Sequence, residues 1–404
     1  MYGLLGKTLK ASFSKEIHAM FGIKDYDYFE IEEENLENFI KSSDYSGLNV
    51  TMPYKIDVMK YLDFISDEAR EVGSVNTIVK ENGRLCGYNT DVYGFNAMLD
   101  KAGFDINNSK VLVLGSGGAS RAVCYVLKER KASQVVIVSR TGENNYDNIS
   151  MHYDCDYIIN ATPVGMSPKV DERILDLSKF YNLKGVGDLI YNPLRTELIL
   201  QAEELNIPAI GGLYMLVAQA KRSDELYTGH GIGDKKLKEV YSALLKRKRN
   251  IVLIGMPGSG KSLIGKCLAK SFKMHLVDTD KLILERTGRS PEEIINSEGE
   301  FAFRKIESDI VREVSAENHI IIATGGGVVT VPSNEHILKH NSIIVYVQRD
   351  INKLTTKGRP LSQKMSVETL FERRKPLYEQ FADVSVTNDT CIGRIIARLK
   401  SNLE

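Results

Sequence analysis

A short glycine-rich stretch past the middle of the chain combines the residue types that phosphate binding needs. Gly-Met-Pro-Gly-Ser-Gly-Lys-Ser at residues 255–262 follows the apolar run 251–254 and precedes a helical pattern at 263–270. Such backbone folds its N–H groups around phosphate oxygens, and the helix N-terminus adds positive charge. Lys261 would reach the β- and γ-phosphates and Ser262 would ligate Mg²⁺. The residues expected to bind ATP or GTP are Gly258, Ser259, Gly260, Lys261, Ser262 and Leu263.

A second glycine-rich stretch predicts a dinucleotide site. Gly-Ser-Gly-Gly-Ala-Ser at residues 115–120 follows the strand pattern 111–114 and opens a helix that reaches residue 129. Gly115 would permit the tight turn and Gly117 the close approach of a pyrophosphate, although Ser120 stands where the fingerprint has a third glycine. The next strand, 135–138, ends in an arginine instead of an acid, which favours a 2′-phosphate and hence NADP(H). The residues expected to hold it are Gly115, Ser116, Gly117, Gly118, Ala119, Ser139, Arg140 and Thr141.

The elements that must position these loops follow an α/β rhythm. Residues 1–100 alternate strand-like runs (47–52, 75–79) with helical stretches (16–20, 57–62). Residues 101–245 hold the dinucleotide unit, a strand at 157–160, a helix at 196–205 and a C-terminal helix that returns to the first domain. The helix 234–248 runs almost directly into strand 251–254, and residues 250–404, with later strands at 320–323 and 343–347, read as an αβα phosphate-binding domain. We therefore expect an α/β substrate domain, a Rossmann-type domain and a P-loop domain.

Composition narrows the class of protein. The 404 residues are 43% hydrophobic and 26% charged with a formal net charge of +0, which argues against a general nucleic-acid or membrane-surface binder. The basic run at 246–249 is interpreted as a solvated helix end. The five cysteines are scattered without C-x-x-C spacing, no secretory leader is evident, and no apolar run approaches a bilayer span. We expect a cytoplasmic enzyme that acts on small molecules.

Polar clusters before the dinucleotide unit carry a resemblance to a known family. They lie at residues 12–14, 49–55, 73–77 and 87–91, and each alone is ordinary turn chemistry. Together and in this order they resemble the shikimate dehydrogenase family. The resemblance continues through 160–166, 188–193 with Thr196, and 212–220, and so covers residues 1–245.

That resemblance implies an NADPH-dependent reduction of 3-dehydroshikimate to shikimate. Lys55 and Asp91 match the family's catalytic pair, in which an ammonium stabilises and protonates the alkoxide that hydride addition creates. Ser12, Ser14, Thr51, Asn76, Tyr191 and Gln219 match residues that bind the substrate, and Leu189 and Gly212 match positions near the nicotinamide. The chain departs from the family at Ala11 and Lys15, and its segment 142–156 lacks room for the usual extra helix and strand.

A second ordered set of motifs surrounds the phosphate-binding loop. It comprises Asp-Thr-Asp at 278–280, Phe-Arg at 303–304 with Glu307, the glycine run 325–327, and arginine motifs at 358–361 and 374–378. One carboxylate near the loop can hold Mg²⁺ and another can accept a hydroxyl proton. Three glycines after a strand leave room for a ligand at the backbone, or make a simple tight turn.

This set resembles shikimate kinase over residues 250–404. By that resemblance Asp280, Arg304, Gly326 and Arg374 bind shikimate, with Asp280 also the base for its 3-hydroxyl. Arg359 matches the lid arginine that reaches the ATP phosphates, Lys261 is catalytic, and Ser262 and Asp278 position Mg²⁺.

The two resemblances meet at one small molecule, which predicts a bifunctional enzyme of aromatic amino-acid biosynthesis that uses NADP(H), ATP and Mg²⁺. Two alternatives remain open. In the first, one domain is active and the other is a degenerate binding or regulatory module. In the second, a quinate-type dehydrogenase is fused to a small-molecule kinase.

Overall fold

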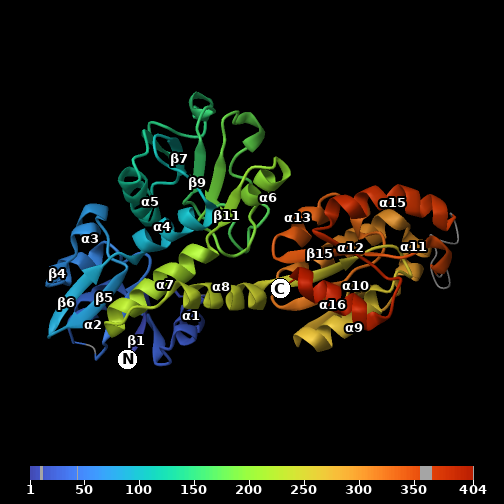
Figure 1. Cartoon of the computed structure of the whole chain (residues 1–404), viewed down its shortest axis with the longest axis horizontal. Helices are drawn as coiled ribbons and strands as arrows, with labels where there is room; N and C mark the ends of the chain where they lie inside the picture. Colours follow the sequence, from blue (N-terminus) through green and yellow to red (C-terminus); the bar gives the residue numbers. More distant parts are fainter. Residues whose placement is uncertain (10–11, 43, 355–365, 404) are drawn as a thin grey trace. The chain divides into compact units, whose positions relative to one another are not determined.

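The chain divides into two compact units in a computed structural model that describes residues 1–9, 12–42, 44–354 and 366–403 (Figure 1). The first unit is Met1–Leu245 and the second is Lys246–Glu404. Within the described ranges, no helix is both long enough and apolar enough to cross a membrane.

The first unit begins with a mixed sheet, in which the strand order among its described residues is β2-β1-β3-β5-β6-β4. The strands are β1 (Tyr2–Gly6), β2 (Tyr26–Glu30), β3 (Gly47–Val50), β4 (Phe64–Ile65), β5 (Thr77–Glu81) and β6 (Arg84–Tyr88). β1 pairs in parallel with β2 and β3, whereas β5 is antiparallel to both of its neighbours. Asn82 and Gly83 join β5 to β6 with φ values of 51° and 76°, as a tight primed hairpin turn requires. Its helices are α1 (Ser14–Phe21), η1 (Glu33–Asn35), α2 (Leu36–Ser42), η2 (Asp57–Tyr61) and α3 (Asp67–Val72).

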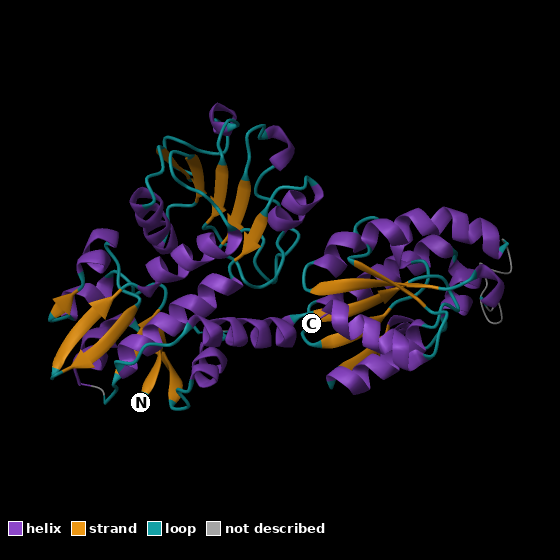
Figure 2. Cartoon of the chain, viewed as in Figure 1, coloured by secondary structure: helices purple, strands orange, loops and turns teal. Residues whose placement is uncertain are grey.

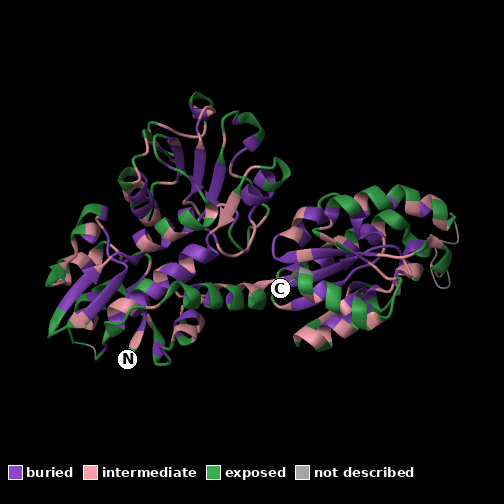
Figure 3. Cartoon of the chain, viewed as in Figure 1, coloured by how far each residue is buried: buried purple, intermediate pink, exposed green. Residues whose placement is uncertain are grey.

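A second sheet of the same unit is parallel throughout, with the order β11-β10-β9-β7-β8 over the residues described. Its strands are β7 (Lys110–Leu114), β8 (Gln134–Val138), β9 (Tyr157–Asn160), β10 (Gly185–Asp188) and β11 (Ala209–Gly211). β7, β9 and β10 are nearly continuous runs of buried residues, as expected for strands covered on both faces (Figure 3). The helical segments are α4 (Thr90–Ala102), α5 (Gly118–Glu129), η3 (Ile149–His152), η4 (Leu177–Lys179), α6 (Glu197–Glu204), α7 (Leu213–Thr228) and α8 (Asp234–Lys248).

Helices α4 and α7 lie side by side between the two sheets (Figure 1). A Cβ on Gly94 of α4 would lie only 2.7 Å from the carbonyl oxygen of Met215 on α7, so glycine allows the helices to meet backbone to backbone. The mixed sheet and the parallel sheet of the first unit are therefore connected by two closely packed helices.

The second unit is one parallel sheet between two helical layers (Figure 2), with the order β13-β14-β12-β15-β16 among its described residues. Its strands are β12 (Asn250–Ile254), β13 (His275–Asp278), β14 (Ile320–Ala323), β15 (Ser342–Gln348) and β16 (Val384–Thr387). The helical segments are α9 (Lys261–Phe272), α10 (Thr279–Thr287), α11 (Pro291–Glu298), α12 (Glu300–Ser315), η5 (Val328–Thr330), α13 (Asn334–Lys339), η6 (Ile351–Lys353), α15 (Val367–Phe381) and α16 (Ile392–Leu403). Separate apolar cores cover the two faces of the sheet.

Three sequence expectations differ from these elements in detail. The stretch 57–62, expected to be helical, forms the 3-10 helix η2. The strand expected at 75–79 is β5, two residues later, because the backbone N–H of Val75 bonds to Lys55 and the carbonyl of Asn76 to Val50. The strand-like run 47–52 ends as β3 at Val50. As expected, the short connection between β8 and β9 holds only the 3-10 helix η3 among the described residues, so β8 forms an edge of its sheet.

Candidate functional sites

The phosphate-binding loop of the second unit connects β12 to α9. Gly255 and Gly260 have φ values of 143° and 100°, where a side chain would be strained, and α9 begins directly at Lys261. The ammonium of Lys261 donates to the carbonyl oxygens of Gly255 (2.7 Å) and Met256 (3.1 Å). The loop therefore wraps around its own lysine at a helix N-terminus, the arrangement that binds phosphate.

A pair of oxygen donors lies next to this loop. The hydroxyl of Ser262, in the first turn of α9, donates to Asp278 Oδ2 at 2.9 Å. Asp278 ends β13 and also caps α10, where its carboxylate accepts from the N–H of Lys281. A hydroxyl and a carboxylate at the phosphate loop are hard oxygen ligands, which suit Mg²⁺.

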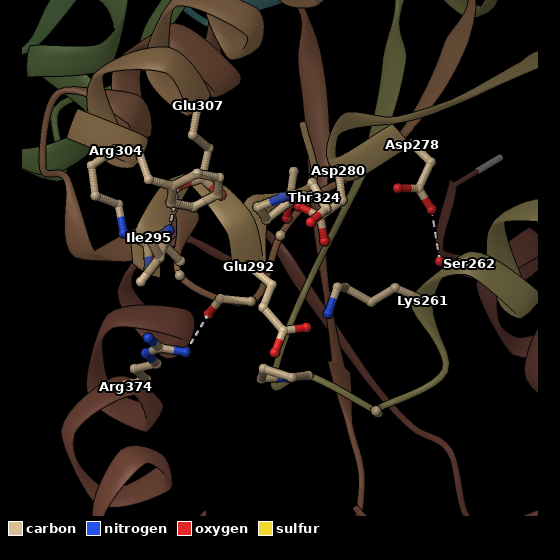
Figure 4. A pocket seen from close by; sticks show the side chains of 18 of the residues that line it. Lys261, Ser262, Asp278, Asp280, Glu292, Ile295, Arg304, Glu307, Thr324 and Arg374 are labelled. Atoms are coloured by element: carbon tan, nitrogen blue, oxygen red, sulfur yellow. Dashed lines mark hydrogen bonds and ion pairs between the residues drawn. The ribbon is translucent and has the colours of Figure 1, made fainter. Parts of the chain in front are cut away.

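A cavity of about 500 Å³ opens beside the loop, and the predicted acceptor residues line it together (Figure 4). Arg304 of α12 bonds through Nη1 to Glu307 Oε2 at 2.5 Å. Arg374 of α15 donates to the carbonyl oxygen of Gly326 at 3.2 Å. The predicted residues brought together here are Gly258, Gly260, Lys261, Ser262, Leu263, Asp278, Asp280, Arg304, Gly326 and Arg374. Arg359 lies outside the described residues.

Side chains of the protein pack directly against the glycine run 325–327. A Cβ on Gly325 would lie 2.5 Å from Glu307 Oε1 and 2.8 Å from Asp280 Oδ1. A Cβ on Gly327 would lie 1.9 Å from Nη2 of Arg304. The glycines therefore let the side chains that line the cavity pack directly on the backbone.

Glu307 lines this cavity beside Arg304. Its carboxyl is fully buried, and burial raises its pKa while Arg304 opposes that rise. A buried carboxylate without a partner is costly in free energy. The ion pair with Arg304 offsets that cost and fixes the position of both side chains.

Sequence reasoning missed several residues of this site. Arg349 and Asn388, just after β15 and β16, donate to the loop carbonyls of Gly258 (2.9 Å) and Ser259 (2.7 Å) and so brace the phosphate loop. The carboxylate of Glu292 on α11 points into the cavity (Figure 4). The only available signal was position, since Arg349 follows a buried strand and Glu292 begins a capped helix.

The first unit contains a second cavity, of about 300 Å³. Lys55 follows β3 and Asp91 lies in the first turn of α4, yet their Nζ and Oδ2 atoms are 2.6 Å apart. Their side chains are 18% and 13% exposed, so the pair is partly desolvated but open to a ligand. The predicted residues that line this cavity are Ser12, Ser14, Thr51, Lys55, Asn76, Asp91, Ala119, Leu189, Tyr191, Gly212 and Gln219.

The serine loop before α1 accommodates the departure from the family at Lys15. The Lys15 ammonium pairs with Asp27 on β2 at 2.9 Å, and the hydroxyl of Tyr28 donates to the carbonyl oxygen of Ser12 at 3.0 Å. Ser12 and Ser14 bond to each other at 3.0 Å. β2 thus holds both serines at the cavity. The other departure, Ala11, lies outside the described residues.

The dinucleotide loop runs from β7 to α5. Gly115 has a φ of 101°, and a Cβ added at Gly117 or Gly118 would meet no protein atom within 4 Å, which leaves space for a ligand at the backbone. The hydroxyl of Ser120 donates to the carbonyl of Gly117 at 2.6 Å, so a buried serine takes the place of the third glycine.

The remaining predicted cofactor residues lie beyond this loop. Arg140 and Thr141 are exposed after β8, and the N–H of Ser139 bonds to the carbonyl of Asn144. A Cβ on Gly212 would lie 2.0 Å from the carbonyl oxygen of Leu189, so two backbones meet at the floor of the cavity. Ser116 is exposed on the loop.

Asp188, at the end of β10, links segments next to the cavity through hydrogen bonds. It accepts hydrogen bonds from the Thr196 hydroxyl (2.6 Å), the Asn160 amide (3.1 Å) and the N–H of Ile190 (3.0 Å). Burial raises the pKa of Asp188 to about 6, against the effect of these bonds. The segment that carries Leu189 and Tyr191 is thereby fixed to β9 and β10.

The fold and these two cavities define an enzyme that joins a dinucleotide-dependent oxidoreductase unit to a P-loop phosphotransferase unit. Comparison with known proteins identifies the families. The model for the substrate-binding domain of shikimate dehydrogenase matches residues 4–78, and the shikimate kinase model matches residues 257–404. The NADP⁺-dependent shikimate dehydrogenase of Clostridium beijerinckii is 39% identical over 262 residues, 60% of this chain and 96% of that protein.

Solved structures agree. A chorismate mutase/shikimate 5-dehydrogenase fusion protein from Clostridium acetobutylicum is 39% identical, covers 60% of this chain and 96% of its own, and has a TM-score of 0.58. Shikimate 5-dehydrogenase from Thermus thermophilus, in complex with NADP(H) and shikimate, is 28% identical over 60% of this chain and 98% of its own, with a TM-score of 0.55. The chain belongs to the shikimate dehydrogenase family, and its second unit carries a shikimate kinase domain.

Proposed function

We propose that this chain catalyses two consecutive reactions, the NADPH-dependent reduction of 3-dehydroshikimate to shikimate and the ATP- and Mg²⁺-dependent phosphorylation of shikimate to shikimate 3-phosphate. The observation that carries the proposal is the gathering of each predicted residue set around its own cavity. We also propose the domain limits 1–100, 101–245 and 250–404.

In the reduction, Lys55 supplies positive charge and a proton. NADPH, when bound, would supply a hydride to the carbonyl carbon, which would leave negative charge on the oxygen. The Lys55 ammonium stabilises that charge and donates its proton to give the new hydroxyl. Asp91, whose Oδ2 lies 2.6 Å from Nζ of Lys55, orients the ammonium. Ser12, Ser14, Thr51, Asn76, Tyr191 and Gln219 would bind the carboxylate and hydroxyls of the substrate.

The cofactor would lie between the glycine loop and the end of β8. Gly117 and Gly118 leave the backbone open to its pyrophosphate, as the space beside them indicates. Arg140 would form charge-assisted bonds to its 2′-phosphate. Leu189 and Gly212 would border the nicotinamide.

In the phosphorylation, Asp280 accepts the proton of the 3-hydroxyl while Lys261 stabilises charge on the transferred phosphoryl group. Ser262 and Asp278 would hold Mg²⁺, which neutralises phosphate charge when bound. Arg304 and Arg374 would hold the carboxylate of shikimate and Gly326 its ring. Arg359, by resemblance, would reach the phosphates when the site closes.

The test supplies 3-dehydroshikimate, NADPH, ATP and Mg²⁺ to the purified chain and identifies the products. We expect shikimate 3-phosphate with equal consumption of NADPH and ATP. Accumulation of shikimate would overturn the kinase assignment. Absence of NADPH oxidation would favour a degenerate first unit, and faster turnover with quinate or NADH would favour a quinate-type dehydrogenase.

We propose a cytoplasmic location for the chain. All five cysteines are free, two of them buried, which suits a reducing compartment. Cell fractionation followed by assay of both activities tests this proposal, and activity recovered in an oxidising compartment would contradict it.

A further inference from the structure

A buried histidine–aspartate pair of the first unit lies outside the set of residues that line its cavity. Nδ1 of His18 on α1 is 2.5 Å from Oδ1 of Asp224 on α7, and the side chains are only 1% and 2% exposed. Oδ2 of Asp224 has no partner among the described residues. Burying such a pair is costly, and well-packed apolar residues often serve stability equally well. Stability alone therefore does not explain why the pair is there.

Tyr26 connects this pair to the cavity. Its ring stacks on the His18 ring with centroids 4.2 Å apart and planes 15° from parallel. Its hydroxyl donates to Asn49 Oδ1 at 2.8 Å, and Asn49 lines the cavity. The pair thus fixes the plane of a tyrosine whose hydroxyl bonds to a residue of the cavity lining.

From Asn49 a chain of hydrogen bonds reaches two predicted substrate residues, Asn76 and Gln219. The Asn49 amide donates to Ser223 (2.8 Å) and Thr77 (3.3 Å), and both hydroxyls bond to Thr90. Thr90 then donates through its backbone N–H to Asn76 Oδ1 (2.7 Å) and through its hydroxyl to Gln219 Oε1 (3.3 Å). The side-chain amide and hydroxyls between Tyr26 and Gln219 can reverse their donor and acceptor sides, whereas the backbone N–H of Thr90 fixes the orientation of Asn76.

We infer that Tyr26 is a positioning residue for the dehydrogenase reaction, in which its hydroxyl, held in place by the His18–Asp224 pair, sets the donor direction of the chain that presents Gln219 to the substrate. The inference rests on the proposed function. A hydroxyl that donates to Asn49 Oδ1 forces the amide NH₂ of Asn49 toward Ser223 and Thr77. Without that hydroxyl the amide can flip, and the donors and acceptors beyond it rearrange.

Tyr26→Phe tests this because it keeps the ring on His18 and removes only the hydroxyl. Tyr45→Phe is the matched control, since Tyr45 is equally buried in the same sheet domain but donates to the carbonyl of Ile40, outside the chain. We expect Tyr26→Phe to raise KM for 3-dehydroshikimate about tenfold, the scale of one lost oriented hydrogen bond, with KM for NADPH and the kinase rate unchanged. Tyr45→Phe should leave all three parameters unchanged.

An unchanged KM for 3-dehydroshikimate in Tyr26→Phe, or an equal rise in Tyr45→Phe, overturns the inference. Wild-type chain that does not reduce 3-dehydroshikimate overturns the proposed function instead, so the two failures are distinct. A second comparison tests the His18–Asp224 pair. Asp224→Asn keeps an acceptor for His18 and should preserve KM for 3-dehydroshikimate, whereas Asp224→Leu should raise it. Equal KM values in these two variants would remove the pair from the inference.

Discussion

Replacement of Lys55 by alanine gives the sharpest test of the dehydrogenase site. The variant removes the ammonium that we propose meets the developing alkoxide, and leaves Asp91 without its partner at 2.6 Å. The Lys55 side chain is 18% exposed, so an intermediate effective dielectric constant applies. Two unit charges about 4 Å apart at an effective dielectric constant of about 20 interact by about 4 kcal/mol. At about 1.4 kcal/mol per factor of ten, that corresponds to a loss of about 10³-fold in rate.

The assay is the steady-state oxidation of NADPH with 3-dehydroshikimate, followed as kcat and KM. We expect the loss in kcat, because the alkoxide charge exists only in the transition state. The KM for NADPH of the same preparation checks that the first unit of the variant is folded. Lys110→Ala is the matched control, because Lys110 pairs with Asp154 at 2.5 Å and is 17% exposed but lies outside the cavity. A kcat for Lys55→Ala close to that of Lys110→Ala would refute the role of Lys55.

Three further predictions concern other parts of the two sites. Gly327→Ala places a Cβ 1.9 Å from Nη2 of Arg304, and displacing that guanidinium should raise KM for shikimate by up to about 10²-fold with KM for ATP unchanged. Gly393→Ala, where an added Cβ meets no atom within 4 Å, is its control, and equal effects would sink the argument. Asp278→Asn should raise the Mg²⁺ concentration for half-maximal kinase activity about tenfold or more, as expected for loss of an outer carboxylate; an unshifted Mg²⁺ titration would contradict this. Because the pKa of Asp188 is raised from 3.8 to about 6 on folding, its contribution to stability is present below pH 4 and is lost as pH rises through 6. This shift corresponds to about 3 kcal/mol of unfolding free energy. In urea unfolding of the first unit, the free energy of unfolding of Asp188→Asn relative to the wild type should therefore rise by about 3 kcal/mol between about pH 4 and about pH 7. A difference between the two proteins that stays constant with pH would contradict this prediction.

Much of the fold could be predicted because the informative signals are local. Apolar runs followed by glycine loops predict β7, β12 and the helices after them, and the structure contains these strands and helices. Where the pattern is weaker the prediction is less accurate, as at residues 57–62, where a 3-10 helix replaces the expected α-helix.

The site was predictable to the extent that each residue lies in a motif. Lys55 and Asp91 gather in one cavity with the predicted substrate residues, although their individual roles stay predictions. What sequence could not supply was pairing between distant segments. His18 and Asp224 are far apart in the chain and carry no motif that joins them. Arg349 and Asn388 brace the phosphate loop from two strand ends that only the folded sheet brings together.

The bonds that Lys261 makes to Gly255 and Met256 also bear on which anions the chain captures in a cell. Free inorganic phosphate is small and has to replace both bonds with contacts of its own to a single group. A nucleoside triphosphate would replace them with contacts spread over several phosphates and a metal ion. Anion binding at this loop is therefore an exchange of the bonds that Lys261 already makes, and the energy of those bonds is subtracted from the affinity for any phosphate.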